Sequence, residues 1–505
     1  MSEPNTLHST ASHPAPLEDS IFDKTSPGTW GVSLPAMEQT EQVESHWQTF
    51  IPEGFRRKTN AKLPEVAQLD AVRHFVRLSQ LNHAIDTGFY PLGSCTMKYN
   101  PKVCDYYYSQ DGLTTLHPMT PESQSQGALR LVYDLQNLLC DVTGFDAFSI
   151  QPAAGAQGEL VGMMMVKAYF EERNELEQRT DVIVPDAAHG TNPATAAMCG
   201  FNVVEIKSGT DGCVDLDALK AALSDKTAAI MLTNPNTLGL FEKDILTISQ
   251  WVHEVGGLLY YDGANLNAVM GHAKPAEMGF DVMHINTHKT FATPHGGGGP
   301  GCGPVGVGET LKPFLPKPVA AFDGKRYYWD VERPLSIGRV KTFNGNFEMM
   351  ARSVMYILAY GALGLKQVST DAVLNANYVR HQLEGTYDIQ FNGLCKHEFV
   401  MNSKHQHAAD ERINTLTIAK RMMDYGIHPM TVYFPLVAKE AMMIEPTETE
   451  SKETLDRFIE VMKAIDEECR NNPELVINAP HTMPIKKVDE VSAARKPNLN
   501  FYCGC

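Results

Sequence analysis

The sequence predicts an α/β protein with a mainly parallel sheet in a large domain, followed by a smaller α+β C-terminal domain. Between residues 127 and 315, short apolar runs alternate with amphipathic stretches, which is typical of parallel strands joined by crossover helices. After about residue 363, helical patterns are interleaved with two short candidate strands, which indicates a separate core. The predicted divisions are an N-terminal arm and helix (1–95), the large domain (96–365) and the C-terminal domain (366–505).

The individual elements follow from hydrophobic periodicity and from turn residues. The arm is rich in Pro, Ser and Thr before one helical pattern near residues 65–82. In the large domain the predicted strands are 181–185, 202–206, 228–233, 258–262, 284–286 and 305–307, and the predicted helices are 160–178, 216–224 and 245–255. In the C-terminal domain we expect helices at 372–383, 412–425 and 449–470 and strands at 398–401 and 430–432. Asp215 and Thr447 are the expected caps of helices 216–224 and 449–470.

Length, composition and charge exclude several classes of protein. A chain of 505 residues with 43% hydrophobic and 20% charged residues is typical of two or three folded domains. Its formal net charge of −17 excludes a large surface for nucleic acid or an anionic membrane. The longest apolar runs are far shorter than the ~18 residues of a membrane-spanning helix. The N-terminus has neither an apolar nor an Arg-rich leader, so we expect a cytoplasmic protein.

The ten cysteines include no CxxC pair, so we expect reduced thiols. The sequence ends in Cys503-Gly504-Cys505. This pair supplies only two of the four ligands of a usual zinc site, so we expect an exposed tail without a site.

Polar residues that follow the predicted strands converge on one edge of the sheet, where ligands of open parallel sheets bind. They are Asp186, His189, Asn234, Asp262, His288 and Lys289. Asp262 ends an apolar strand, so a cation or a hydrogen-bond donor should face it. Lys289 lies just past the next strand, and a right-handed crossover brings it to the same edge.

The pairing of Lys289 with Asp262 has two interpretations. A lysine in a partly dry site can form a Schiff base, and an aspartate that holds a pyridinium nitrogen is its companion when the cofactor is pyridoxal phosphate. A structural salt bridge between the same two residues is the alternative.

Two further segments bear on such a cofactor. Small residues from Gln151 to Glu159 directly precede the helix predicted from Leu160, and backbone N–H groups at a helix start bind anions. Gly155 would let the backbone approach a phosphate closely, although an ordinary glycine-rich helix entry is the alternative. His189 lies in a Gly/Pro/Asn turn that is expected to expose its ring, which could stack on a pyridine face or be merely structural.

The glycine-rich segment from His295 to Gly306 argues against two other activities. It contains GxGxxG, but a strand is predicted after it where a dinucleotide fingerprint requires a helix. It also resembles the HGGG loop of lipases, yet the chain has no GxSxG to supply a nucleophile. Cys302 has no obvious base beside it and is expected to pack in the interior.

Several of these stretches together carry a family resemblance. They are Pro91–Lys98, Gln151–Glu159, Ala188–Ala194, Tyr261–Asn265, and Asn286–Phe291 with His295–Gly301. In combination they resemble the glycine decarboxylase P-protein of the glycine cleavage system, in the C-terminal-half form that occurs as a separate subunit 2. The resemblance runs from about Ser33 to beyond Tyr378 and implies a type I pyridoxal-phosphate-dependent transferase fold.

The resemblance also implies roles for seven residues. Lys289 would form the internal aldimine, Asp262 would pair with the pyridinium nitrogen, His189 would stack on the ring, Ala264 would pack on its other face, and Gly155, Ala156 and Thr287 would hold the phosphate. Some relatives carry serine where this chain has Ala154, so the phosphate would depend more on backbone groups.

The implied activity is that of glycine dehydrogenase (aminomethyl-transferring). Glycine is decarboxylated through a pyridoxal-phosphate aldimine, and the aminomethyl group passes to the lipoyl arm of the H-protein with release of CO2. Another type I enzyme acting on a free small amino acid and a non-catalytic scaffold subunit are the alternatives.

The implied partners are P-protein subunit 1, in an α2β2 heterotetramer, and the acidic, lipoylated H-protein. Arg56–Lys58 and Lys325–Arg326 are the candidate basic contacts for the H-protein. Two roles stay open: Arg339 or Arg412 as the group that binds the glycine carboxylate, and His288 or His295 as the group that protonates the lipoyl sulfur.

Overall fold

The computed structural model describes residues 17–33, 49–59, 61–391 and 393–499, so the Cys503–Cys505 tail lies outside the described residues. The chain divides into two compact units, one of residues 1–87 with 482–505 and one of residues 88–481. Residues 482–499 therefore group with the arm, whereas the predicted C-terminal domain included them. Among the described residues, no helix combines the length and apolar character needed to span a bilayer.

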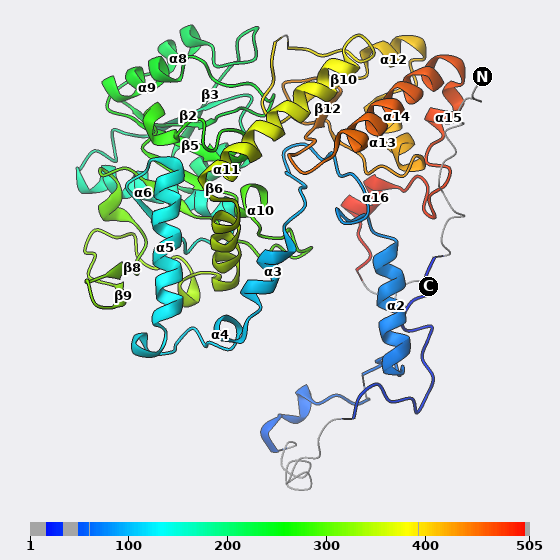
Figure 1. Ribbon diagram of the computed structural model, residues 1–505, viewed down its shortest axis with the longest axis horizontal. Coiled ribbons are helices and arrows are strands. Elements are labelled where there is room, and N and C mark those ends of the chain that lie inside the picture. The colour runs from blue at the N-terminus through cyan, green and yellow to red at the C-terminus, as the bar shows by residue number, and fades with distance from the viewer. Residues whose placement is uncertain (1–16, 34–48, 60, 392, 500–505) are drawn as a thin grey trace. The chain divides into compact units, whose positions relative to one another are not determined.

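The larger unit is built on a seven-stranded sheet (Figure 1). Its order is β1-β7-β6-β5-β4-β2-β3. The strands are β1 (Ala147–Ser149), β2 (Asp181–Pro185), β3 (Asn202–Ile206), β4 (Thr227–Thr233), β5 (Leu258–Gly263), β6 (Val282–Ile285) and β7 (Val305–Val307). β3, β2, β4, β5 and β6 pair in parallel, and β7 is antiparallel to both β6 and β1. The predicted mainly parallel sheet is confirmed, although β1 was not predicted and β6 begins two residues earlier than expected.

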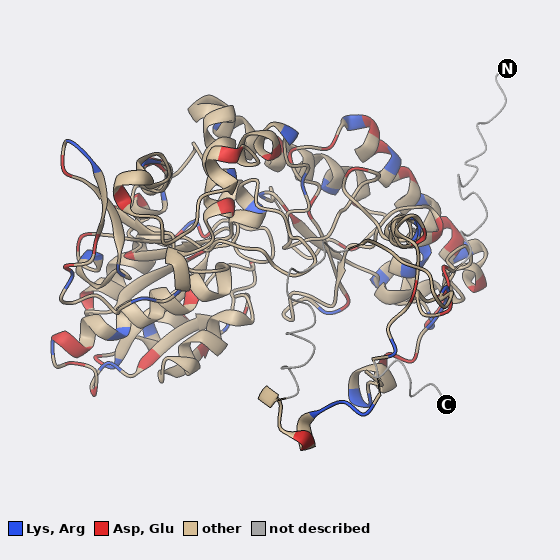
Figure 2. Ribbon diagram, turned by 90° about the horizontal axis from the view of Figure 1, so that it is seen from below, with Lys and Arg blue, Asp and Glu red and all other residues tan. Residues whose placement is uncertain are grey.

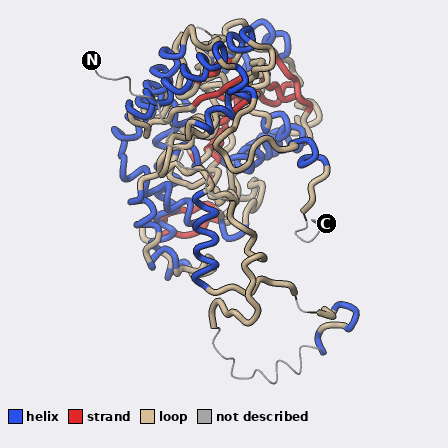
Figure 3. Tube along the Cα trace, turned by 90° about the vertical axis from the view of Figure 1, so that its right-hand side faces the viewer, coloured by secondary structure: helices blue, strands red, loops and turns tan. Residues whose placement is uncertain are grey.

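Helices pack on both faces of this sheet, and Figure 3 distinguishes the helices from the strands along the chain. The helices are α5 (Gln126–Thr143), α6 (Gly155–Glu172), α7 (Thr191–Met198), α8 (Leu216–Ala222), α9 (Ile245–Glu254) and α11 (Phe347–Leu383). Successive strand residues point to opposite faces. Val182 and Val184 pack with α6 and α7, whereas Ile183 belongs to the core formed with α5, α8, α9 and α11.

The C-terminal part has a second core around a three-stranded antiparallel sheet, in the order β10-β12-β11. Its elements are β10 (Phe399–Asn402), α12 (Lys404–Ala409), α13 (Thr415–Asp424), β11 (Thr431–Val432), β12 (Ala441–Ile444), α14 (Lys452–Asn471) and α15 (Pro473–Ile477). Helix α11 runs through both cores and is broken at Gly361, where φ is 60°. The predicted boundary between residues 365 and 366 falls close to this break and stays a prediction.

Two helix starts test the predicted caps. The Asp215 side chain accepts hydrogen bonds from the N–H groups of Asp217 and Ala218, as expected for an N-cap. The cap predicted at Thr447 is wrong, because α14 begins at Lys452 and Ser451 accepts from the Thr454 N–H.

The remaining elements are short connections. They are η1 (Glu53–Phe55), α2 (Gln68–Gln80), α3 (Lys102–Tyr108), α4 (Asp111–Thr114), η2 (Glu122–Gln124), η3 (Leu266–Ala268), η4 (Pro275–Met278), α10 (Thr287–Thr290), η5 (Lys312–Phe314), a hairpin of β8 (Val319–Phe322) and β9 (Tyr327–Asp330), η6 (Thr342–Asn344), and α16 (Glu490–Arg495). Helix α2 is the helix predicted in the arm. It buries only His74, and Val72 and Phe75 are more than half exposed, so the described part of the arm has little core of its own.

Glu242 illustrates the cost of burying a carboxyl group in this fold. It is 3% exposed, and burial raises its pKa from 4.5 to about 7 although Val214 N–H and Asn236 Nδ2 donate to it. Because the folded pKa is the higher one, its contribution to stability is complete below the unfolded pKa and is lost as pH rises through the folded pKa. From pH 4.5 to 8 we expect the wild type to lose about 3 kcal/mol of unfolding free energy relative to Glu242→Gln. Urea unfolding of both proteins across this range measures the difference, and a constant difference would contradict the prediction.

Candidate active site

Asp262 lies at the carboxyl end of β5 and is 1% exposed. His189 Nδ1 lies 2.7 Å from its Oδ2, His284 Nε2 lies 3.3 Å from its Oδ1, and the Ala264 N–H donates to Oδ1 at 3.0 Å. Burial alone would raise the pKa of Asp262, but the two histidines and the Ala264 N–H outweigh it and hold this pKa well below its usual range. The carboxylate is therefore charged at neutral pH.

His284 is a functional candidate that the sequence analysis missed. It pairs with Asp262 across β5 and β6, and the Tyr260 hydroxyl lies 2.7 Å from its Nδ1. Burial lowers the pKa of His284 to about 4 despite the nearby carboxylate, so the ring is neutral at pH 7. A Tyr260 hydroxyl that donates to Nδ1 leaves the Nε2 proton directed at Asp262. A polar residue inside the apolar run of a strand was the available signal.

Lys289 lies in α10, directly after β6, and is 8% exposed. The structure brings it to the same edge of the sheet as Asp262, as the crossover predicts, because β5 and β6 are parallel neighbours. Within the described residues its ammonium group forms no hydrogen bond or ion pair, and none with Asp262. The alternative of a structural salt bridge between these two residues is therefore wrong.

The start of α6 makes unusually close backbone approaches. Gly155 is its first residue, and a Cβ there would lie 1.4 Å from Asn286 Oδ1. A Cβ at Gly303 would lie 2.0 Å from the carbonyl oxygen of Ala154. The glycine-rich segment thus packs its backbone against the entry to α6, which larger residues would prevent.

The other two candidate phosphate residues lie in different environments. Ala156 is exposed in the first turn of α6, so its N–H belongs to the free donors of a helix start. Thr287 is buried, and its hydroxyl donates to the carbonyl oxygen of Cys302 at 2.7 Å, which leaves its backbone as the available group. Cys302 packs in the interior as expected, and burial raises the pKa of its thiol to about 12.

Gly155→Ala tests the close packing at this helix start. We expect it to lower affinity for pyridoxal phosphate at least about tenfold and to destabilise the protein by about 1–3 kcal/mol, because Asn286 must move. Titration followed by absorbance, together with thermal unfolding, measures both. Gly127→Ala is the matched control in the first turn of α5, where a Cβ meets nothing within 4 Å, and it should change stability by no more than about 1 kcal/mol. Equal behaviour of the two variants would contradict the prediction.

His189 lies between β2 and α7, and its side chain is 13% exposed. The expectation that a turn exposes the His189 ring is wrong. The residues that follow His189 form α7, and its ring is largely enclosed. Its Nε2 lies 2.9 Å from Ser94 Oγ, and the ring is stacked with Phe434 at 9° and 6.3 Å between centroids.

Segment 91–98 joins the large-sheet residues to two buried glutamates, which the sequence analysis also missed. Ser94 and Thr96 have φ values of 62° and 48°, which non-glycine residues rarely adopt. The Ser94 N–H donates to Glu398 Oε2 at 2.7 Å, and the Thr96 N–H and hydroxyl donate to Glu445 at 2.8 and 2.6 Å. Glu445 directly follows β12, so the criterion that found Asp262, a carboxylate at the end of an apolar strand, would have found it too.

The four residues left open earlier occupy distinct positions. Arg412 pairs with acidic groups on the exposed surface and is thereby excluded as a carboxylate ligand, whereas Arg339 is exposed and bonded to Asn344. His288 and His295 lie together, with His295 Nε2 2.9 Å from the His288 carbonyl oxygen. Burial lowers the pKa of both rings, that of His288 to about 3, so neither holds a second proton at neutral pH.

Comparison with known proteins identifies the family. The family described as "Glycine cleavage system P-protein" matches residues 37–319, and "Glycine dehydrogenase, C-terminal domain" matches residues 368–483. The chain is 54% identical over 481 residues to "Probable glycine dehydrogenase (decarboxylating) subunit 2" of Caldanaerobacter subterraneus subsp. tengcongensis, covering 95% of this chain and 98% of that protein. It is 55% identical over 485 residues to the protein of the same name from Desulforamulus reducens, covering 96% and 99%.

Solved structures confirm the fold. A crystal structure of glycine decarboxylase (P-protein) of the glycine cleavage system in inhibitor-bound form has a TM-score of 0.71 and 17% identity, covering 86% of this chain and all of that one. A NifS-like protein has a TM-score of 0.56 and 15% identity, covering 75% and 99%. The predicted type I pyridoxal-phosphate-dependent transferase fold is confirmed. With relatives of more than 50% identity over nearly its whole length, the chain belongs to the glycine cleavage system P-protein family, as a member of the glycine dehydrogenase (decarboxylating) subunit 2 type.

Proposed function

We propose that this chain is the cofactor-carrying subunit of a glycine decarboxylase that transfers an aminomethyl group from glycine to the lipoyl arm of the H-protein. The observation that carries the proposal is the combination of an unpaired, buried Lys289 with a charged, buried Asp262 at the same sheet edge. A scaffold subunit has no need for both groups, because burying each of them costs stability.

The residues present fit pyridoxal phosphate. Lys289 has an amine free for covalent attachment, and Asp262 has a negative charge suited to a pyridinium nitrogen. The start of α6 offers N–H groups with no side-chain cap, which suit the phosphate of the cofactor. When bound, the cofactor supplies an electron sink for the bond that breaks at the α carbon of glycine.

The chain's own residues would divide the work as follows. His189 would contact one face of the cofactor ring and Ala264 the other, and Gly155, Ala156 and Thr287 would hold its phosphate through backbone groups. Asp262 would keep the ring nitrogen protonated, with its own charge maintained by His284. Segment 91–98 would help to exclude water, because it connects His189 to the buried glutamates.

The partners follow from the same family. The subunit 2 type implies subunit 1, and we propose an α2β2 complex with it. The half-exposed apolar residues of α2 suit such an interface. In Figure 2, Lys and Arg are interspersed with Asp and Glu along the ribbon. Lys325 and Arg326, at the exposed tip of the β8–β9 hairpin, stay a candidate contact for the acidic H-protein, as do Arg56–Lys58.

The direct test is release of labelled CO2 from carboxyl-labelled glycine by the cofactor-loaded complex of both subunits. We expect release to require lipoylated H-protein, with H-protein that lacks the lipoyl group as the control. Release without any H-protein would support the alternative, an enzyme that acts on a free amino acid. No release under any condition would reject the proposed function.

A further inference from the structure

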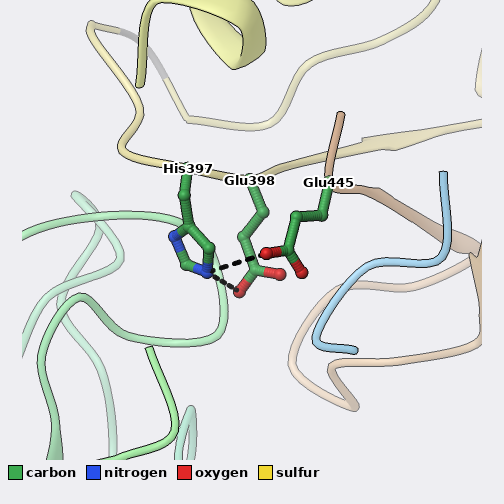
Figure 4. A group of neighbouring side chains, drawn as sticks. All are labelled: His397, Glu398 and Glu445. Carbon is green, nitrogen blue, oxygen red and sulfur yellow. Dashed lines mark ion pairs between the residues drawn. The ribbon is translucent and has the colours of Figure 1, made fainter. Parts of the chain in front are cut away.

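Three fully buried side chains form a polar cluster near Lys289: His397, Glu398 and Glu445, each 0% exposed (Figure 4). His397 Nε2 lies 3.7 Å from Glu398 Oε1 and 3.9 Å from Glu445 Oε1. Neither ring nitrogen of His397 has a hydrogen-bond partner, and Glu398 Oε1 has none either. Buried polar atoms without partners are costly, so three of them in one cluster require an explanation, of which a functional role is one.

The two glutamates are held differently. Glu445 accepts three hydrogen bonds, two from Thr96 and one from Asn267 Nδ2 at 3.3 Å, which favours its charged form. Glu398 accepts a single bond, from the Ser94 N–H, and its Oε1 is free to carry a proton. Two neighbouring buried carboxyl groups cannot both be charged without a large repulsion, so the proton belongs on Glu398.

The pKa directions agree with this assignment. Burial, reinforced by the charge of Glu445, raises the pKa of Glu398 well above its ordinary value, and burial raises the pKa of Glu445 to about 7. The charged and titratable groups that act on this cluster are Lys289 from α10, Cys95 from segment 91–98, His189 from the loop after β2, Cys395 from the segment before β10, and the cluster's own three members. Burial lowers the pKa of His397 to about 3, so its ring holds no second proton at neutral pH, whereas burial raises the pKa values of Cys95, to about 11, and of Glu398, so both keep their protons.

A continuous path links this acid to the proposed cofactor site. Asp262 contacts His189, His189 contacts Ser94 Oγ, and the Ser94 N–H contacts Glu398. The charge of Lys289 also acts on both glutamates. The cluster is therefore linked to Asp262 through His189 and Ser94, and it lies within range of the charge of Lys289.

We propose that Glu398 is the acid that protonates the leaving lipoyl sulfur, with Glu445 and His397 as positioning residues. The inference rests on the proposed function. The α carbon of glycine loses CO2 and forms a bond to one lipoyl sulfur, and the electron pair of the broken C–C bond reduces the disulfide. The second sulfur leaves as a thiolate and takes the proton of the Glu398 carboxylic acid. With glycine as a zwitterion and the product amine as an ammonium group, the reaction takes up one proton, which Glu398 regains from solvent.

The test uses the cofactor-loaded complex of both subunits with Glu398→Gln. We expect H-protein-dependent CO2 release to fall about 10²–10⁴-fold, because a general acid is lost, while glycine still changes the absorbance of the bound cofactor. The wild-type rate should fall as pH rises through the pKa of the donor, and this alkaline limb should disappear in the variant. Glu242→Gln is the matched control, since it removes an equally buried carboxyl group elsewhere and should leave rate and profile unchanged.

A second readout does not depend on turnover. Infrared difference spectra of the complete chain, recorded across a pH titration, should contain the carbonyl stretch of a buried carboxylic acid that Glu398→Gln removes. Glu398→Asp should keep this band, and its rate should be about tenfold higher than that of Glu398→Gln. This result separates proton donation from a folding defect.

The outcomes that would overturn the inference are distinct. A Glu398→Gln rate within about threefold of the wild type, or an unchanged infrared band, would reject it while leaving the proposed function intact. If a chelator slows the wild type as much as Glu398→Gln does, the cluster holds a cation and not the donated proton. Loss of activity in Cys95→Ala with full activity in Glu398→Gln would move the sulfur chemistry to Cys95. An inactive wild type would reject the proposed function itself.

Discussion

Lys289→Ala is expected to abolish glycine decarboxylation, with a loss of at least about 10⁴-fold. The variant removes the amine that would bind the cofactor covalently, and with it the one lysine of α10. The absorbance band of the protonated Schiff base should be absent when pyridoxal phosphate is added to the variant, with or without subunit 1.

Lys167→Ala is the control for this variant. Lys167 is a half-buried lysine of α6 whose ammonium group donates to the Cys199 carbonyl oxygen at 2.9 Å, outside the site. It should keep both the absorbance band and the activity. A band that survives in Lys289→Ala would show that another amine carries the cofactor and would reject the assignment.

Asp262→Asn is expected to lower the decarboxylation rate about 10³-fold, with little change in the yield of purified protein. The amide cannot supply the negative charge that keeps a pyridinium nitrogen protonated, and its NH2 group faces a donor on His189 or on His284, whichever oxygen it replaces. The measurement is the rate at saturating glycine, together with the absorbance spectrum of the bound cofactor.

The same substitution carries a pH signature in stability. The folded pKa of Asp262 is lowered, so its contribution is present above the unfolded pKa of about 3.8 and is lost as pH falls through the folded pKa. The stability deficit of Asp262→Asn should therefore shrink in acid. Asp466→Asn is the control, because Asp466 is also buried but pairs with Arg470 in the C-terminal core. An Asp262→Asn enzyme as active as this control would reject a role for the carboxylate.

Much of the large domain could be predicted because its signals are local. Parallel strands buried on both faces read as short apolar runs, so β2, β3 and β7 were predicted with the bounds that the structure has. The elements that were missed include β12 and also α5, although Ser125 and the left-handed Gly144 mark the two ends of α5. The α14 cap was misplaced because the Pro446–Glu448 stretch resembles a helix start, whereas Thr447 is buried with a φ of 65°.

The sequence by itself determined the residues that terminate the strands, and hence that Asp262 and Lys289 meet at one edge. Parallel strands place their carboxyl ends at the same edge of the sheet, however the other parts of the chain pack. Only the tertiary structure decided which groups face them. His284 on the neighbouring strand holds the Asp262 carboxylate, and Lys289 is left unpaired. Glu398 and Glu445 come from a different sheet, joined to the site by segment 91–98 more than 300 residues away in sequence. No local pattern encodes such contacts, because they depend on how two separately formed cores pack together.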